Sequence, residues 1–457
     1  MENDTLVPPE TIDPAQLGVG MLQQHVADNV EALNHLEPEA AAAVLARLPA
    51  ERAVEILDQP ELDLAPEIVA LLQPEQAGRL LGAMAADRAA DIFRRLAEPS
   101  RSQLLASLDV DSRASVERLL VYPPNTAGSI MTTEFVSAPS TWTVEQTLQH
   151  IRQVERTRET VYAIYVLDLQ TRRLLRSISL RRLISADPHA SILSAARTLE
   201  PITVSPLTDR EEVGRLFRKY DLLAVPVVDK FGHVLGIVTV DDVIDTILEE
   251  SSEDVQKFGG MEAIERPYMQ IGFAQMIRKR AGWLCALFLS EMLTASAMQH
   301  FESELEKAIV LTLFIPLIMS SGGNSGSQAT SLLIRALALQ ELRLRDWWRV
   351  ALRELPTGVV LGAILGIIGI VRITLWQKFG LFDYGPHWQL VAITIGAALV
   401  GIVTFGSIAG SMLPFILQRL GFDPASASAP FVATLVDVTG LVIYFSVALV
   451  FLTGTLL

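Results

Sequence analysis

The stretch PFVATLVDVTGLVIYFSVALVFL, residues 430–452, has the length and composition of a membrane-spanning helix. About 20 consecutive apolar residues suffice to cross the hydrocarbon core of a bilayer. Asp437 interrupts this apolar run. A carboxylate at the bilayer centre costs roughly 3 kcal/mol on insertion scales, and such groups usually face the bundle interior and mark ion paths. The alternative is a carboxylate that is hydrogen-bonded to a neighbouring helix and has no role in transport.

Five apolar segments of this kind follow residue 275, at about 280–299, 309–333, 355–377, 388–417 and 429–456. Arg278, Lys279 and Arg280 precede the first segment, and the basic stretch RLRDWWRVALRE follows the second. Basic residues that flank membrane spans lie mainly on the cytosolic side. We therefore predict a multi-pass protein of the plasma (inner) membrane, with cytosolic N-terminal domains and the C-terminus outside.

Charge separates the two halves of the chain. After Glu265 there are 13 basic and 10 acidic residues, which leaves 24 basic and 42 acidic residues before it, a balance of −18. Such an acidic half disfavours nucleic acid as a partner and favours cations. The single cysteine, Cys285, excludes an intrachain disulfide and a thiolate metal cluster. The sequence contains no nucleophile–base pair or Walker-type loop that would predict an enzyme.

The soluble half contains two kinds of internal repeat. After a lead of residues 1–20 that we expect to be disordered, residues 21–121 contain the related stretches PEAAAAVLARL, PEQAGRLLGAM and ADRAADIFRRL. Each begins with a residue that favours a helix start and continues with apolar spacing of three and four, which predicts short amphipathic helices. A stack of such helices is a small solenoid, so we predict an all-α helical-repeat domain.

The second repeat predicts a tandem pair of α/β units. AIYVLD at Ala163–Asp168 recurs as AVPVVD at Ala224–Asp229, 61 residues later, and RSISLRRLI recurs as GIVTVDDVI, 60 residues later. Each copy has the pattern of a strand, a turn, a strand and a helix. We place the copies at residues 122–185 and 186–248, a connecting helix at 249–274 and the transmembrane domain at 275–457.

The second apolar segment carries SSGGNSGSQAT, residues 320–330, at membrane depth. Asn324 and Gln328 are four residues apart and share a helix face, so they could line a pore together with Thr434 and Ala429. The other interpretation is a close helix–helix contact through small residues, and both can hold. Hydroxyls, amides and a carboxylate suit Mg²⁺ or Ca²⁺ better than zinc or copper. Because we count one carboxylate per chain, a twofold dimer would bring two to its axis. This sparse, polar site fits a hydrated Mg²⁺ best.

The chain resembles the MgtE family of magnesium channels over nearly its whole length. The stretches that carry the resemblance are YPPNTAGSIMT, SSGGNSGSQAT, LGFDPASASAPFVATLVDVTGLVIYF and the acidic VDDVIDTILEESSEDVQKFGG. The resemblance implies a tandem cystathionine-β-synthase (CBS) pair, a homodimer with the pore on its twofold axis, and Asp437 as the selectivity carboxylate. It also implies that SEDVQKFGGMEAIERPYMQI forms a helix that plugs the cytosolic mouth.

The resemblance further implies regulatory Mg²⁺ sites on cytosolic carboxylates. These residues are Asp87 and Asp91 in the N domain, Asp209, Glu211, Asp221, Asp242 and Asp245 in the second CBS unit, Glu250, Glu253 and Asp254 in the connecting helix, and Asp423 at the pore edge. Asp242, Asp245 and Glu249 are spaced by three and four residues, which places them on one helix face. For any single residue the alternative is a solvated acidic surface. Tyr165 and Arg182 lie where relatives hold adenine nucleotide, so ATP is a further candidate ligand, although Leu222 replaces the usual aromatic residue.

These observations lead to a Mg²⁺-selective channel that closes when cytosolic Mg²⁺ bridges its acidic surfaces. One alternative is a proton-coupled divalent cation transporter in which Asp437 carries the proton. A second is a membrane-anchored sensor of ions or nucleotides that transports nothing.

Overall fold

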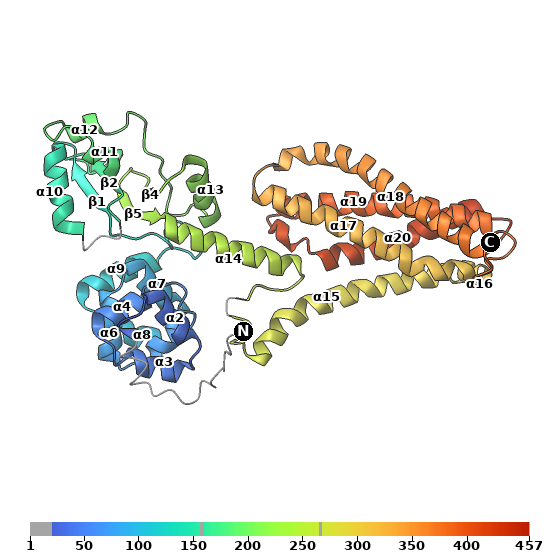
Figure 1. Cartoon of the computed structure of the whole chain (residues 1–457), viewed down its shortest axis with the longest axis horizontal. Coiled ribbons are helices and arrows are strands. Elements are labelled where there is room, and N and C mark those ends of the chain that lie inside the picture. The colour runs from blue at the N-terminus through green and yellow to red at the C-terminus, as the bar shows by residue number, and fades with distance from the viewer. Residues whose placement is uncertain (1–20, 156–159, 265–266, 457) are drawn as a thin grey trace, which may run out of the picture. The chain divides into compact units, whose positions relative to one another are not determined.

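The computed structural model describes residues 21–155, 160–264 and 267–456, so the expected disordered lead of residues 1–20 lies outside the described residues. The chain forms two compact units that divide after Glu250 (Figure 1). The first unit holds a helical domain and an α/β pair, and the second holds the long apolar helices. Helix α14 (Val240–Phe258) begins in the first unit and ends in the second.

The helical domain is a stack of short helices in which each helix packs against the next but one. Contacts join α2 to α4, α3 to α5, α4 to α6, α5 to α7, α6 to α8 and α7 to α9, which confirms the predicted solenoid. The helices are α2 (Val26–Asn34), α3 (Pro38–Leu45), α4 (Ala50–Leu57), α5 (Ala65–Leu71), α6 (Pro74–Ala83), α7 (Ala86–Arg95), α8 (Ser100–Ser107) and α9 (Val110–Leu120).

Side-chain N-caps are mostly absent from these short helices. Among the helices just named, Asp109 alone caps its helix, by accepting from the backbone N–H groups of Asp111 and Ser112. Helices α3, α5 and α6 instead have proline in the first turn. Proline is suited to this position because the first helical N–H groups have no intrahelical acceptor.

The α/β pair has the predicted internal symmetry. The first copy consists of β1 (Val136–Pro139), α10 (Val144–Val154), β2 (Ala163–Leu167), β3 (Leu174–Ser179) and α11 (Leu180–Ile184). The second consists of α12 (Ile192–Ala195), α13 (Arg210–Tyr220), β4 (Ala224–Val228), β5 (Val234–Thr239) and the start of α14. Strand β1 is parallel to β2, β2 is antiparallel to β3, and β4 is antiparallel to β5.

The two copies exchange their leading segments, so a boundary at residue 186 does not separate independent units. Thr132 exchanges backbone hydrogen bonds of 2.8 and 2.9 Å with Ile237 of β5, in the second copy. Gly236 allows this approach, because a Cβ there would lie 2.5 Å from the carbonyl oxygen of Thr132. In the opposite direction, Ile192 donates to the carbonyl of Trp142 at 3.0 Å in the first copy.

The second unit contains five helices that are long and apolar enough to cross a membrane, as expected. They are α15 (Phe273–His300), α17 (Ile315–Ala338), α18 (Trp347–Lys378), α19 (Trp388–Arg419) and α20 (Ala429–Leu452). The short helix α16 (Glu302–Lys307) and the 3-10 turns η3 (Ile309–Phe314), η4 (Leu344–Asp346) and η5 (Pro424–Ser426) connect them. Helices α17, α19 and α20 pack against one another, α18 packs along α19, and α15 contacts α20.

Some helices begin or end at other residues than the predicted spans, chiefly where an amphipathic stretch precedes the apolar segment. Helix α18 begins at Trp347 rather than near 355, because the amphipathic stretch before the apolar core continues the helix. Helix α15 begins at Phe273 rather than near 280, for the same reason. Helix α20 ends at Leu452 rather than near 456, and Gly454 follows with a φ of 82°.

The connecting helix is shorter than predicted. Helix α14 ends at Phe258, and the described residues from Gly259 to Gly272 form turns and irregular structure. Gly260 has a φ of 75°, which is outside the helical region and which glycine adopts at little cost. The expectation of one continuous helix over 249–274 is therefore wrong.

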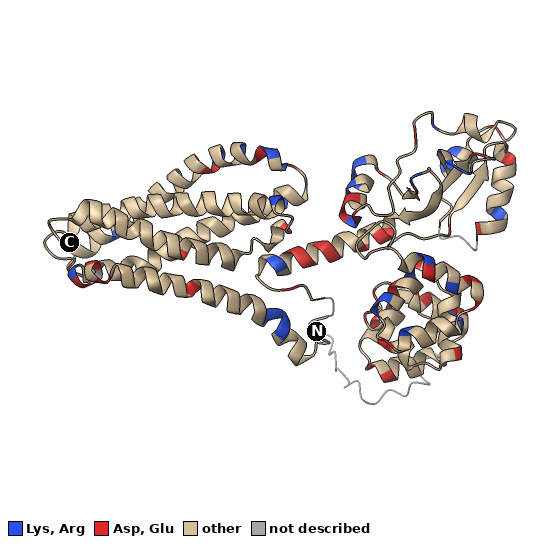
Figure 2. Cartoon of the chain, turned by 180° about the vertical axis from the view of Figure 1, so that it is seen from behind, with Lys and Arg blue, Asp and Glu red and all other residues tan. Residues whose placement is uncertain are grey.

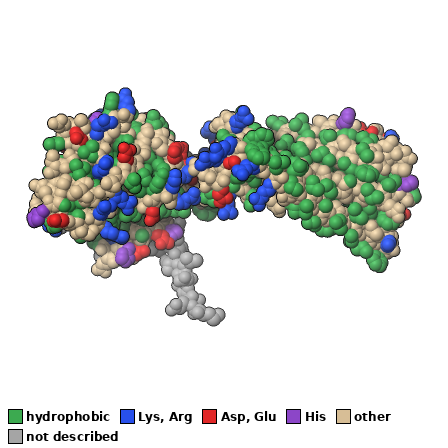
Figure 3. Space-filling view, turned by 90° about the horizontal axis from the view of Figure 1, so that it is seen from above, with side chains coloured by type: hydrophobic (Ala, Val, Ile, Leu, Met, Phe, Trp, Pro, Cys, Tyr) green, Lys and Arg blue, Asp and Glu red, His purple; other side chains and the backbone are tan. Residues whose placement is uncertain are grey.

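Charged and apolar residues are distributed as a membrane location requires. Figure 2 shows few charged residues along the long helices of the second unit and many in the first. Hydrophobic side chains cover most of the five-helix unit on the face seen in Figure 3. No residue in the spanning window of α15 is fully buried within this single chain, so much of its apolar surface faces lipid or another chain.

Candidate ion pathway and regulatory carboxylates

Asp437 is half-buried, about a third of the way along α20 from its N-terminal end. Ser428 caps this helix by accepting from the N–H of Phe431, and Pro430 lies in the first turn. A Cβ on Gly322 of α17 would lie 2.7 Å from Val436, and one on Gly440 would lie 3.4 Å from Met319 of α17. Asp437 therefore lies at the level of residues 319–322 in α17.

Helix α17 has two different faces, so both interpretations of SSGGNSGSQAT hold. Gly322 and Gly326 are buried, and a Cβ on either would lie within 2.7 Å of a side chain on α19 or α20. Ser320, Asn324 and Gln328 are exposed within this chain. The small residues thus make the helix contact, while the polar side chains leave an open face that begins at the level of Asp437.

The other two predicted pore residues are less open. The hydroxyl of Thr434 donates to the carbonyl of Pro430 at 3.0 Å, and this side chain is buried. Ala429 is half-buried at the first turn of α20, where its carbonyl accepts from the hydroxyl of Ser327 at 3.4 Å. Of the predicted pore-lining residues, Asn324 and Gln328 are therefore the ones with exposed polar side chains.

A second intramembrane acid lies near Asp437. Glu291 of α15 is close enough to Asp437 for the two carboxylates to interact electrostatically. Trp283 of α15 donates its Nε1–H to the hydroxyl of Ser428 at 3.2 Å, so α15 packs beside the start of α20. The count of one carboxylate per chain was wrong. The signal was present in the stretch LFLSEMLTAS within the first apolar segment.

Asp87 and Asp242 come together from two domains of the first unit. Burial, and next the charge of Asp87, raise the pKa of Asp242 to about 7. The hydroxyl of Thr239 donates to Asp242 at 2.6 Å. Burial also raises the pKa of Asp245, and the negative charges of Glu61 and Glu249 raise it further. The start of α14 and the helical domain thus meet through acidic side chains.

Other predicted metal ligands have partners within the chain. Asp91 pairs with Arg94 at 3.3 Å. Arg210 binds Glu250 at 2.6 Å and Glu249 at 2.8 Å. Among the described residues, no group of three or more His, Cys, Asp or Glu side chains is placed to hold a metal ion.

The acidic residues around α13 have local roles in its structure. Asp209 is the N-cap of α13 and accepts from the N–H of Glu211 at 2.8 Å. Glu211 pairs with Arg215 at 2.6 Å. Asp221 is the C-cap, with a φ of 54°. Of the remaining candidates, Asp254 is half-buried on α14, and Glu253 and Asp423 share the ammonium of Lys257.

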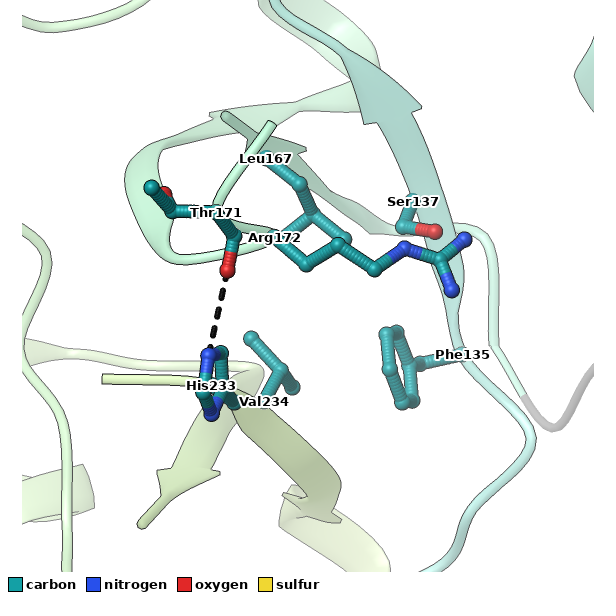
Figure 4. Close-up of a pocket in the computed structure, with 7 residues that line it drawn as sticks. All are labelled: Phe135, Ser137, Leu167, Thr171, Arg172, His233 and Val234. Atoms are coloured by element: carbon teal, nitrogen blue, oxygen red, sulfur yellow. Dashed lines mark hydrogen bonds between the residues drawn. The ribbon is translucent and has the colours of Figure 1, made fainter. Parts of the chain in front are cut away.

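The two candidate nucleotide-binding residues differ in solvent exposure. Tyr165 is 1% exposed and packs edge-on against Phe135, whereas Arg182 is exposed on α11. Among the described residues the Tyr165 hydroxyl has no hydrogen-bond partner. A nearby cavity of about 450 Å³ is lined by Phe135, Ser137 and Leu167 from the first copy and by His233 from the second, and neither Tyr165 nor Arg182 lines it (Figure 4).

Three family models match this chain. A divalent cation transporter model matches residues 315–447, the MgtE intracellular N domain matches 24–125, and a CBS domain matches 193–249. The magnesium transporter MgtE of Thermus thermophilus is 42% identical over 329 residues, which are 72% of this chain and 70% of that protein. The chain belongs to the MgtE family of magnesium transporters.

Another MgtE relative, from Enterococcus faecalis, is 38% identical over 331 residues, with the same shares of the two chains. Among solved structures, the cytosolic domain of the Mg²⁺ channel MgtE in complex with ATP is 34% identical. It covers 51% of this chain and 95% of its own, with a TM-score of 0.48. The MgtE domain order of helical domain, CBS pair and membrane helices is the one seen here.

Proposed function

We propose that this MgtE-family protein is a Mg²⁺-selective channel that works as a homodimer and closes when cytosolic Mg²⁺ rises. One observation carries the proposal: Asp437 lies half-buried at the level where the polar face of α17 opens. Exposure of the polar side chains of Ser320, Asn324 and Gln328 to lipid would be unfavourable. A second copy of the chain that completes a water-filled path would remove this exposure.

Asp437 acts in this proposal as the selectivity carboxylate. Mg²⁺ dehydrates reluctantly and usually binds through one or two carboxylates with waters retained. Two copies of Asp437 across a dimer axis would attract a hydrated ion, and hydroxyl and amide groups of α17 would contact its waters. Glu291 adds negative charge close by. The resulting field favours divalent over monovalent cations.

The regulatory part of the proposal rests on the acidic surfaces. Asp87 and Asp242 interact across two domains of the first unit, and Asp245 lies near Glu61. Mg²⁺ between such groups would replace repulsion with attraction and favour a compact state. Closure is then a population shift set by tighter Mg²⁺ binding to that state. Cytosolic N-terminal domains and an external C-terminus follow from the basic residues that flank α15 and α17.

Current through inside-out patches, recorded while Mg²⁺ is varied on the cytosolic face, tests the proposal. We expect single-channel Mg²⁺ currents whose open probability falls as cytosolic Mg²⁺ rises. Flux without unitary currents that depends on a proton gradient would indicate the proton-coupled transporter instead. Failure to restore growth of a strain that lacks magnesium uptake, at normal expression, would indicate a sensor.

Adenine-nucleotide binding by the CBS pair is a separate proposal. It is supported by the buried Tyr165 hydroxyl, which has no partner among the described residues. A bound nucleotide would supply the missing acceptor. Titration of ATP into the full-length protein should give saturable binding that Tyr165→Phe weakens, and equal binding by both proteins would remove Tyr165 from the site.

A further inference from the structure

Lys257 lies between two of the carboxylates that are candidates for Mg²⁺ binding. Its Nζ is 2.5 Å from Oε1 of Glu253 and 2.6 Å from Oδ2 of Asp423. Glu253 is one turn earlier on α14, and Asp423 is in the loop between α19 and α20. The three side chains are 27%, 30% and 36% exposed for Lys257, Glu253 and Asp423. The ammonium thus occupies the place that a shared cation would take.

The ammonium keeps its charge in this position. Burial alone would lower the pKa of Lys257, but hydrogen bonds and charges from Asp423 and Glu253 outweigh burial and raise it above its ordinary value. Both oxygens of Asp423 are engaged, because Oδ1 accepts from the N–H of Ala425 at 2.8 Å. An incoming ion would have to replace the Lys257 contact to reach Asp423.

The surrounding contacts join the end of α14 to the loop before α20. Phe258, next to Lys257, packs against Ile334, Ala425 and Ala427. Gly260 then turns the chain so closely that a Cβ would lie 2.8 Å from the indole of Trp283. These apolar contacts bring the end of α14 to the loop, and the ion pair between Lys257 and Asp423 completes the contact.

We propose that Lys257 is a built-in cation that links Glu253 to Asp423 when Mg²⁺ is scarce and that Mg²⁺ must displace. The inference rests on the proposed regulation by cytosolic Mg²⁺ and names a residue that sets its threshold. One ammonium neutralises one of the two carboxylate charges and holds the link partly formed. A divalent ion neutralises both, so it replaces the ammonium once its concentration is high enough.

Removal of the ammonium therefore has opposite effects at low and high Mg²⁺. Without Mg²⁺, Glu253 and Asp423 would repel each other, and the end of α14 would separate from the loop more often. With Mg²⁺, the ion would no longer compete with a covalently attached cation. Its half-saturating concentration should fall by about three- to tenfold, the range expected for partly exposed ion pairs.

Hydrogen exchange of the full-length protein in detergent, followed by mass spectrometry, measures both effects. The readout is backbone protection in residues 251–262, recorded without Mg²⁺ and along a MgCl₂ titration. In Lys257→Met we expect less protection than in the wild type without Mg²⁺, and half-maximal protection at a lower Mg²⁺ concentration. Lys257→Arg keeps the charge and should change both values less.

Lys279→Met is the matched control, because Lys279 pairs with Glu262 at 3.5 Å in the adjoining segment and has no contact with Asp423. It should leave the Mg²⁺ midpoint unchanged. An unchanged or higher midpoint in Lys257→Met would overturn the competition, as would a wild type that Mg²⁺ does not protect. Patch currents test the proposed channel function independently. A failure of the Lys257 proposal can therefore be distinguished from a failure of the channel proposal.

Discussion

Asp242 of α14 interacts electrostatically with Asp87 of α7, and the two residues belong to different domains of the soluble half. Burial and the charge of Asp87 raise the pKa of Asp242 to about 7. The folded protein therefore binds this proton more tightly than the unfolded chain does. As pH rises from about 4 to 7, ionisation of Asp242 lowers stability, and above this window the cost is complete.

A divalent cation beside Asp87 and Asp242 would offset the loss of stability that ionised Asp242 causes. Asp242→Asn removes this negative charge, so the variant does not lose that stability. At pH 8 without Mg²⁺ we expect the variant to melt at a higher temperature than the wild type. Added MgCl₂ should stabilise the variant less than the wild type. Thermal unfolding of the full-length protein in detergent measures both, with Glu55→Gln as a control because Glu55 pairs with Arg52 elsewhere on the helical domain. Equal Mg²⁺-induced shifts would contradict a site at this pair.

Replacement of Asp437 should abolish or strongly reduce magnesium flux while the protein still folds. Asp437→Ala removes the carboxylate at the level of the open face of α17, and Asp437→Asn, which keeps the shape but not the charge, should cause an intermediate loss. Uptake of Mg²⁺ by a strain that lacks its own transporters measures the effect. Glu302→Gln in the short helix α16 is the control. Normal uptake by Asp437→Ala at normal expression would remove this residue from the ion path.

Simultaneous neutralisation of Asp91, Asp242 and Glu250 should raise the open probability at high cytosolic Mg²⁺. Conductance at low Mg²⁺ should change little, because these residues lie in the soluble half. Asp91 and Glu250 also pair with arginines, so the control neutralises three other paired acids, Glu55, Glu117 and Glu145. Inside-out patch recordings compare the two triple variants. Normal closure of the first variant at high Mg²⁺ would show that Asp91, Asp242 and Glu250 are not needed for regulation by Mg²⁺.

Asp58 should make the helical domain less stable as pH rises from about 4 to 6. Burial raises the pKa of Asp58 to about 6, against the opposing effects of the Ala85 N–H and the charge of Arg88. The stability present at low pH is therefore lost as the pH passes through this value. Asp58→Asn keeps an acceptor for Ala85, so the variant should gain on the order of 1 kcal/mol relative to the wild type at pH 7.5 compared with pH 4.5. Melting curves of both proteins at the two pH values test this prediction. The same difference in melting temperature between variant and wild type at both pH values would contradict it.

Gly410→Ala should destabilise the membrane unit. A Cβ there would lie 2.1 Å from the carbonyl oxygen of Gly326 and 2.8 Å from the hydroxyl of Thr330. Helices α17 and α19 would have to separate, at a cost of about 1–3 kcal/mol. Gly282→Ala is the control, because a Cβ on Gly282 meets nothing within 4 Å in this chain. The temperature at which the detergent-solubilised protein aggregates should fall for the first variant and not for the second.

The fold was predictable from sequence where a period or a length determines it. The 61- and 60-residue offsets reappear as the offsets between β2 and β4 and between β3 and β5. The five spans follow from the lengths of the apolar segments. The end of α14 at Phe258 agrees with the local signal of Gly259 and Gly260, and not with the longer helix that the family resemblance implied.

The candidate site was less predictable because it depends on contacts between distant segments. Asp437 and Glu291 are each visible in the sequence as a charge in an apolar segment, but only the structure brings the two helices together. The pairing of Glu250 with Arg210 joins residues 40 positions apart, and that of Asp423 with Lys257 joins residues 166 apart. Sequence spacing identifies which carboxylates share a helix face, but not which arginine or lysine neutralises them.

The exchange of leading segments between the CBS copies limits how this protein can change during evolution. Residues Thr126 and Thr132, which precede β1 in the first copy, pair with residues of the second copy. Deletion of the first copy together with its lead would leave the backbone groups of Ile237 unpaired at a sheet edge. Exposed strand edges recruit other chains and promote aggregation. Loss of the first copy alone would therefore expose this edge of the second copy.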